Sequence, residues 1–216
     1  MQDKRILVVG YGKLGKRIAN ELFTKHNVTA LKRQALESSP ALNMCYADIT
    51  HSEDLSRSLN EGIKHGVDYL IYCLSPSERS EQAYREAYLI GLKNLISCLP
   101  NIEALQHIFF ISSTSVYHQK NGEVVDELSP CLPKGFAGNI LLEAESYLNR
   151  LKTPSTVIRF SGIYGGNRNN PAEPFSYYTW DGEASWDINK NAQDGAWVHP
   201  LFESDKTGTE PISKLW

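Results

Sequence analysis

One short segment, RILVVGYGKLGKR at residues 5–17, constrains the fold of this 216-residue chain more than any other. Residues 5–10 form an apolar run that ends in glycine, which is typical of a β-strand buried on both faces. Glycines then follow the spacing G-x-G-x-x-G and lead into a helix with apolar residues at i, i+4 and i+8. A strand, a glycine turn and a helix in this order predict the phosphate-binding turn of a dinucleotide-binding domain.

Each glycine of this turn has its own physical task. Gly10 permits the tight turn, Gly12 lets a pyrophosphate approach the backbone, and Gly15 lets the helix pack closely on the strand. The start of the helix offers free N–H groups and about half a positive charge to the phosphates. A purely structural glycine turn is the alternative. We expect cofactor contacts throughout the turn, from Gly10, Tyr11, Gly12, Lys13, Leu14 and Gly15.

The residues at the end of the second expected strand indicate whether the cofactor is NAD or NADP. About twenty residues after the glycine turn, an NAD-binding protein places an acid that holds the ribose 2′-hydroxyl. Lys32 and Arg33 occupy that place here, and the next acid is Glu37. Because arginine can bind a phosphate through two hydrogen bonds, this pair favours NADP over NAD. An ordinary solvated basic pair is the alternative.

Strands alternate with helices along most of the chain, which favours a parallel sheet with helices on both faces. We expect strands within residues 5–10, 27–31, 42–49, 67–74, 107–112 and 155–164. We expect helices within residues 13–26, 52–62, 78–99 and 139–151. The predicted fold class is α/β, a doubly wound parallel (Rossmann) sheet with strand order 3-2-1-4-5-6, and the cofactor should lie at the carboxyl ends of strands 1 and 4.

The composition changes after Tyr164. The remainder contains few Leu, Ile or Val residues but all four tryptophans of the chain. An irregular or partly disordered tail is one interpretation. The other is a loop-rich segment whose aromatic side chains cover the sheet or contact a partner. We therefore expect a dinucleotide-binding domain at residues 1–166 and a loop-rich aromatic tail at residues 167–216.

The net charge and the cysteines exclude several classes of partner and site. A net charge of -3 gives no general attraction to nucleic acid or to an acidic membrane. No apolar run approaches the ~18 residues of a membrane helix, and the first residues do not form a signal peptide. The four cysteines include no C-x-x-C pair and no cluster with histidine. We expect reduced thiols, no metal site and a cytoplasmic location.

Several motifs within residues 4–166 resemble the short-chain dehydrogenase/reductase superfamily, above all its extended and atypical branches of NAD-dependent epimerase/dehydratase type. They are ADIT at 47–50, YCLSP at 72–76, YREAYLIGLKNLISCL at 84–99, ISSTSVYHQKNGEVVDELSP at 111–130 and IRFSGIYGG at 158–166. The resemblance implies that Asp48 and Ile49 lie beside the adenine. It also implies that Leu74 and Ser75 lie along the ribose of the cofactor.

The resemblance further implies a catalytic set. In the family, a Ser or Thr after strand five orients the substrate oxygen, and the matching position is Ser113. A tyrosine then transfers a proton, and a lysine four residues later lowers its pKa, because a free tyrosine titrates near ~10. Aligning the family's acidic helix residue with Glu143 places Gly135 and Asn139 at these two positions, and aligning it with Glu145 gives no such pair either. No tyrosine in the chain has a lysine four residues after it.

Two residues that follow Ser113 in the sequence, Tyr117 and His118, are candidates to replace the missing Tyr–Lys pair. Tyr117 lies just past the strand, and His118 follows it and can carry a proton near pH 7. The tail is also much shorter than the substrate lobe of extended family members. We therefore carry two hypotheses: an NAD(P)-binding oxidoreductase or epimerase-like protein acting on a small sugar or carbonyl compound, and a non-catalytic dinucleotide sensor. A homodimer is left open.

Overall fold

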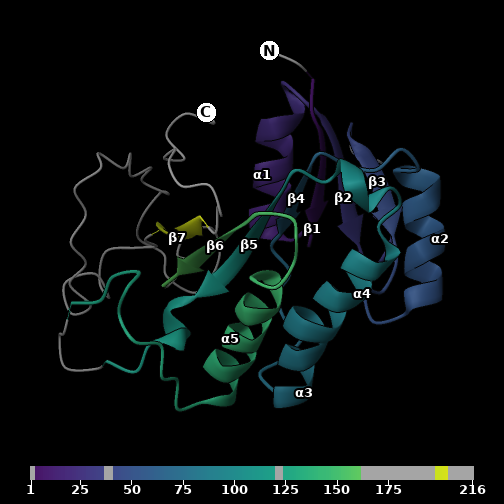
Figure 1. Cartoon of the computed structure of the whole chain (residues 1–216). Coiled ribbons are helices and arrows are strands. Elements are labelled where there is room, and N and C mark those ends of the chain that lie inside the picture. Colours follow the sequence, from purple (N-terminus) through teal and green to yellow (C-terminus); the bar gives the residue numbers. More distant parts are fainter. Residues whose placement is uncertain (1–2, 37–40, 120–123, 162–197, 204–216) are drawn as a thin grey trace, which may run out of the picture.

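The computed structural model describes residues 3–36, 41–119, 124–161 and 198–203 (Figure 1). Its sheet has the strand order β3-β2-β1-β4-β5-β6-β7. The strands are β1 (Arg5–Val9), β2 (Asn27–Lys32), β3 (Asn43–Tyr46), β4 (Tyr69–Tyr72), β5 (His107–Ser113), β6 (Ser155–Phe160) and β7 (Val198–Glu203). The first six are parallel to one another, so the predicted doubly wound fold and its strand order are confirmed.

Helices cover both faces of the sheet (Figure 1). They are α1 (Lys13–Phe23), α2 (Ser52–Gly62), α3 (Glu81–Tyr84), the π-helix η1 (Arg85–Ile90), α4 (Gly91–Cys98) and α5 (Phe136–Leu148). Two short 3-10 turns, η2 (Ile102–Ala104) and η3 (Thr114–Val116), flank β5. The helix expected at residues 78–99 is therefore present, but it contains a π turn, and α5 begins three residues earlier than its pattern predicted.

The central strand β1 is buried on both faces, as its continuous apolar run predicted. Leu7 and Val9 belong to the apolar core shared with α2, α4 and α5. Ile6 and Val8 point to the opposite face and pack in the core that includes Ala19 of α1. The period-2 alternation of a strand thus divides one apolar run between two cores.

The tail was expected to be irregular, and the structure describes only residues 198–203 of it. They form β7, which the sequence analysis did not predict and which pairs antiparallel with β6. The other tail residues and the predicted domain boundary at residues 166–167 lie outside the described residues. Within the described part of the chain, no helix is long and apolar enough to span a membrane.

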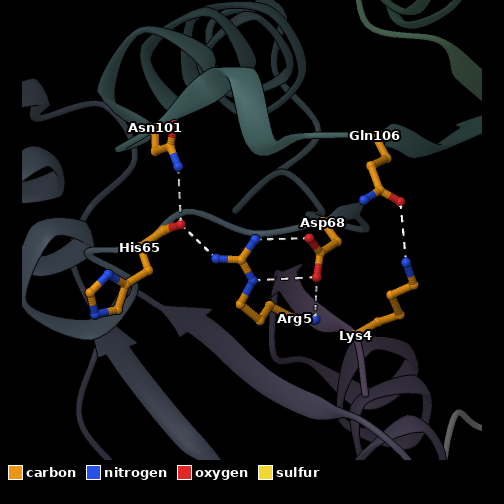
Figure 2. Close-up of polar contacts among 6 residues, drawn as sticks. All are labelled: Lys4, Arg5, His65, Asp68, Asn101 and Gln106. Atoms are coloured by element: carbon orange, nitrogen blue, oxygen red, sulfur yellow. Dashed lines mark hydrogen bonds and ion pairs between the residues drawn. The ribbon is translucent and has the colours of Figure 1, made fainter. Parts of the chain in front are cut away.

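A polar network holds the amino-terminal edge of the sheet, opposite the expected cofactor site (Figure 2). Arg5 at the start of β1 donates to Asp68 through its backbone N–H at 2.8 Å and through Nη2 at 2.8 Å. Its Nη1 also donates to the carbonyl of His65 at 2.6 Å, which Asn101 Nδ2 approaches at 3.3 Å. These bonds connect β1 to the segments that enter β4 and β5.

The Arg5 hydrogen bonds hold the pKa of Asp68 below its usual value, although burial of the carboxylate acts in the opposite direction. A carboxylate with a lowered pKa in the folded state adds stability above its unfolded pKa of about 3.9. That contribution is lost as the pH falls through the folded-state pKa. Asp68 should therefore stabilise the protein at neutral pH and not in acid.

We predict that Asp68→Asn lowers the free energy of unfolding by about 1–2 kcal/mol at pH 7, since it weakens charge-assisted hydrogen bonds to Arg5. The difference from the wild type should stay constant down to about pH 4 and shrink below it, as the pH falls toward the folded-state pKa of Asp68. Urea unfolding at several pH values measures it. Asp54→Asn is the matched control, because its pair with Arg57 is exposed and should contribute little. A pH-independent difference would contradict the assignment.

Candidate functional site

A cavity of about 290 Å³ opens at the carboxyl ends of β1, β2 and β4, where the strand order reverses. Nine of the twelve predicted cofactor residues line it: Gly10, Tyr11, Gly12, Lys32, Arg33, Asp48, Ile49, Leu74 and Ser75. Lys13, Leu14 and Gly15 lie in the first turn of α1 and are not among the lining residues. The structure thus brings together side chains from four separate sequence motifs.

The three glycines of the turn meet different constraints. Gly10 has φ of 96°, and a Cβ on it would lie 2.8 Å from the carbonyl oxygen of Cys73. A Cβ on Gly15 would overlap the carbonyl oxygen of Gly10. A Cβ on Gly12, in contrast, would meet no atom within 4 Å. Gly10 and Gly15 are therefore required by the fold, whereas Gly12 leaves open space at the cavity wall.

The start of α1 faces this open space without a side-chain cap. Gly12 is the N-cap residue, and the first turn contains no acidic residue. The first helical hydrogen bond runs from Lys16 N–H to the Gly12 carbonyl at 2.9 Å. An uncapped helix start carries partial positive charge and suits an anionic ligand.

Basic and acidic side chains meet at the far end of the cavity. Lys32 is the half-buried last residue of β2, and Arg33 after it is exposed. Asp48 accepts hydrogen bonds from Thr50 N at 2.9 Å and from Thr50 Oγ1 at 2.7 Å. Burial raises the pKa of Asp48, but the Thr50 bonds and the charges of His51 and Arg33 outweigh it and keep the pKa below its usual value. Asp48 is therefore ionised at neutral pH and already has donors of its own.

Sequence reasoning missed half of the cavity wall. The additional lining residues are Val9, Leu31, Ala47, Thr50, Cys73, Ser77, Ala83, Glu86 and Ala87. Three of them lie on α3 and η1, and a helical pattern alone does not show which turn faces a ligand. Cys73 is a packing residue, since burial raises the pKa of its thiol to about 12 and its Sγ donates to the Val9 carbonyl at 3.2 Å.

The π turn η1 shapes the cavity wall that it contributes. The hydroxyl of the fully buried Tyr72 donates to the carbonyl of Ala87 inside this turn. Gly91 follows, and a Cβ there would lie 2.7 Å from Ile49 Cγ2, which belongs to another cavity residue. π turns occur mostly as single insertions in α-helices and often lie at functional sites. Here the widened turn places Glu86 and Ala87 on the cavity wall.

Ser113, the predicted substrate-orienting residue, lies at the carboxyl end of β5. It is half-buried, and its Oγ accepts a hydrogen bond from Ser115 N at 3.2 Å. It is the N-cap of the short turn η3. Ser113 does not line the cavity described above, so it lies at the same edge of the sheet in a separate position.

Tyr117 and His118, the two candidate replacements for the proton-transfer pair, follow η3. The Tyr117 hydroxyl donates to the Asp126 carbonyl at 2.9 Å and accepts from Arg159 Nη1 at 2.8 Å. Burial raises the pKa of Tyr117 even though Arg159 acts to lower it. Nδ1 of His118 is buried and has no hydrogen-bond partner among the described residues.

The positions aligned with the family's Tyr–Lys pair lie at the start of α5. Gly135 is the N-cap residue, and a Cβ on it would meet no atom within 4 Å. Asn139 is exposed, and its N–H bonds to the Gly135 carbonyl at 3.2 Å. Neither position presents an ionisable side chain. Within the described residues, no group of three His, Cys, Asp or Glu side chains could hold a metal ion.

Comparisons with known proteins now give the chain a family. No family model matches it, and no curated protein matches its sequence. A solved protein of Methylobacillus flagellatus, described as an NAD-dependent epimerase/dehydratase, is 37% identical over 76% of this chain and 56% of its own, with a TM-score of 0.62.

Two more distant solved structures share the fold. Uronate dehydrogenase from Agrobacterium tumefaciens is 22% identical over 69% of this chain and 56% of its own, with a TM-score of 0.55. The Bordetella bronchiseptica enzyme WbmH, in complex with NAD+, is 14% identical over 79% of this chain and 60% of its own, with a TM-score of 0.62. This chain therefore spans little more than half the length of each of these proteins.

The sheet order, the glycine turn at its switch point and the similarity to the Methylobacillus protein agree with one another. The chain belongs to the short-chain dehydrogenase/reductase superfamily, in its extended branch of NAD-dependent epimerase/dehydratase type.

Proposed function

We propose that the chain binds a nicotinamide dinucleotide in the cavity at the carboxyl ends of β1, β2 and β4. The observation that carries this proposal is the open space at Gly12 beside the uncapped start of α1. A pyrophosphate requires both a close approach to the backbone and unpaired N–H donors. Structures of the neighbour WbmG were determined in complex with NAD, which supports the same class of ligand.

Each group of cavity residues is proposed to contact a different part of the cofactor. In this proposal the glycine turn holds the pyrophosphate, Asp48 and Ile49 border the adenine, and Leu74 and Ser75 lie along the ribose. Lys32 and Arg33 hold a 2′-phosphate, which makes NADP the preferred form. Asp48 lies in the same cavity wall, and its Oδ1 is already bonded to Thr50.

The proposed activity is that of an oxidoreductase or epimerase-like protein that acts on a small sugar or carbonyl compound. The bound cofactor would supply the hydride chemistry. In the chain itself, Ser113 is the residue that we propose to orient the substrate oxygen. Without a positioned Tyr–Lys pair, the rate should be lower by about 10²–10⁴-fold than with a positioned acid/base.

A non-catalytic dinucleotide sensor is the second candidate function. It is favoured by the two positions at the start of α5, where Gly135 offers no side chain and Asn139 offers an exposed amide. Both functions require cofactor binding, and they differ in whether bound cofactor is consumed. A panel of sugars and carbonyl compounds, followed by NADPH absorbance, separates them.

We predict that NADP(H) binds at least tenfold more tightly than NAD(H), since one charge-assisted hydrogen bond is worth about 1.5–3 kcal/mol. Lys32→Ala combined with Arg33→Ala should abolish this preference and leave NAD(H) affinity nearly unchanged. Isothermal titration calorimetry at physiological salt measures both constants. Arg57→Ala is the matched control, because Arg57 borders a neighbouring hollow and does not line the cofactor cavity. Equal constants for the two cofactors in the wild type would refute the assignment.

We predict that Gly12→Val folds normally but loses cofactor binding. The new side chain meets no protein atom near its Cβ, so it should fill the pyrophosphate space instead. Gly15→Ala should show the opposite pattern and unfold more easily, because its Cβ would overlap the Gly10 carbonyl. Thermal unfolding and calorimetric titration of both variants test the distinction. If Gly12→Val bound the cofactor normally, the turn would be purely structural.

We predict that Ser113→Ala lowers kcat/KM about tenfold if the protein is an enzyme, which corresponds to the loss of one hydrogen bond of ~1.5 kcal/mol in the transition state. Cofactor affinity should barely change. Ser115→Ala is the control, because it keeps the backbone N–H that donates to Ser113 Oγ. If the protein is a sensor, no wild-type turnover should appear, and Gly135→Tyr with Asn139→Lys should not create it.

A further inference from the structure

A buried ion pair lies between α5 and β6, next to the end of β5. Arg159 donates to both carboxylate oxygens of Glu145, through Nε at 3.1 Å and through Nη2 at 2.6 Å. The two side chains are only 4% and 6% exposed. Ser112 Oγ also donates to Glu145 at 2.6 Å. Because a buried charge is costly without a partner, these bonds fix the guanidinium in one place.

Another donor of this guanidinium, Nη1, reaches Tyr117. Arg159 Nη1 donates to the Tyr117 hydroxyl at 2.8 Å, and the guanidinium carbon lies 5.0 Å from the centre of the Tyr117 ring. The hydroxyl donates in turn to the Asp126 carbonyl at 2.9 Å. Tyr117 is thus the connection between a rigid buried pair and a chain segment far from it in sequence.

Apart from Tyr117, the segment is held by the buried Val125 and by Cys131, which packs against the main core. A turn closes within it, where Asp126 Oδ1 accepts from Leu128 N at 3.0 Å and from Ser129 Oγ at 2.7 Å. Leu128 is 84% exposed and Leu132 is 63% exposed, so neither fastens the segment to the core. Among the large apolar side chains described at residues 124–132, Val125 alone is buried. The Tyr117 hydroxyl is therefore a principal attachment of the turn.

The same bonds determine the protonation state that Tyr117 needs. A phenol that donates to a carbonyl must carry its proton, and the Asp126 carbonyl accepts nothing from a phenolate. Arg159 acts to lower the pKa of Tyr117, but burial of the side chain outweighs this effect and keeps the pKa above its usual value. The arrangement therefore stabilises the neutral phenol.

We infer that Tyr117 is a positioning residue whose hydroxyl fastens the turn at residues 126–129 to the Glu145–Arg159 pair. Because β5 ends at Ser113 and η3 leads directly into Tyr117, the fastened turn is a fixed wall on the side where Ser113 would meet a substrate. The substrate in this statement rests on the proposed function, whereas the fastening itself does not. In this inference Tyr117, bonded to Arg159 and to Asp126, is a structural strut after β5 and not a replacement base.

Hydrogen exchange of the intact chain, read by mass spectrometry, tests the strut. In Tyr117→Phe, amides of residues 126–129 should exchange about tenfold faster, since one hydrogen bond to the turn is lost. Peptides from β1 and α5 should keep their wild-type rates. Tyr147→Phe is the matched control, because Tyr147 lies on α5 and its hydroxyl has no hydrogen-bond partner among the described residues. Unchanged exchange at residues 126–129 in Tyr117→Phe would overturn the inference.

Two further outcomes separate this inference from the proposed function. If no dinucleotide binds but exchange at residues 126–129 rises, the proposed function fails and the strut stands. If a substrate is found, Tyr117→Phe should raise KM and leave the pH dependence of kcat in place. A loss of kcat with a displaced pH profile would instead make Tyr117 a catalytic residue and overturn the positioning role.

Discussion

The contact between Gly15 of α1 and the Gly10 carbonyl is the constraint on which the cofactor cavity depends. It holds α1 directly against the end of β1, and the left-handed φ of Gly10 turns the chain between them. The same turn lies against Cys73 just after β4, the other strand of the switch point. Among the three glycines of the turn, Gly12 is the one at which an added Cβ would meet no atom within 4 Å. The cavity is thus a consequence of close packing, and a larger residue at Gly10 or Gly15 would displace its wall before any ligand arrived.

Local patterns in the sequence were sufficient for the elements, and they failed where the structure depends on distant residues. The apolar runs and the glycine spacing predicted β1, α1 and the strand order, because a strand period and a helix start are properties of neighbouring residues. The π turn was not predictable from its helical pattern, since the Tyr72 hydroxyl that enters it comes from β4. Thr50 and Glu86 were missed for the same reason, and only a fold places them beside Asp48 and the glycine turn.

At the end of β5, a difference of one position along the strand decides which of two serines is buried. Ser112 and Ser113 are adjacent and chemically identical, yet strand alternation turns Ser112 inward to Glu145 and leaves Ser113 half-buried at the edge. Family resemblance selected Ser113, the one at the sheet edge, and its role on substrate is still a prediction. The charged Arg159 is 3% exposed within β6, and a charge this deeply buried needs a partner. The sequence could not identify this partner as Glu145, because that depends on the pairing of β5 with β6 and on the position of α5 over both strands.

The charged groups at the two ends of the proposed site are arranged differently. At the proposed cofactor end, Lys32 and Arg33 line the cavity beside Asp48, whose Oδ1 accepts both hydrogen bonds from Thr50. At the other end, Arg159 is paired with the buried Glu145, and the Tyr117 hydroxyl is bonded on both sides. Burial outweighs the effect of Arg159 there and keeps the pKa of Tyr117 above its usual value. Within the residues that the structure describes, basic side chains thus lie where we propose that a dinucleotide phosphate binds, and Tyr117 is held as a neutral hydrogen-bond donor, which agrees with the positioning role that we infer for it.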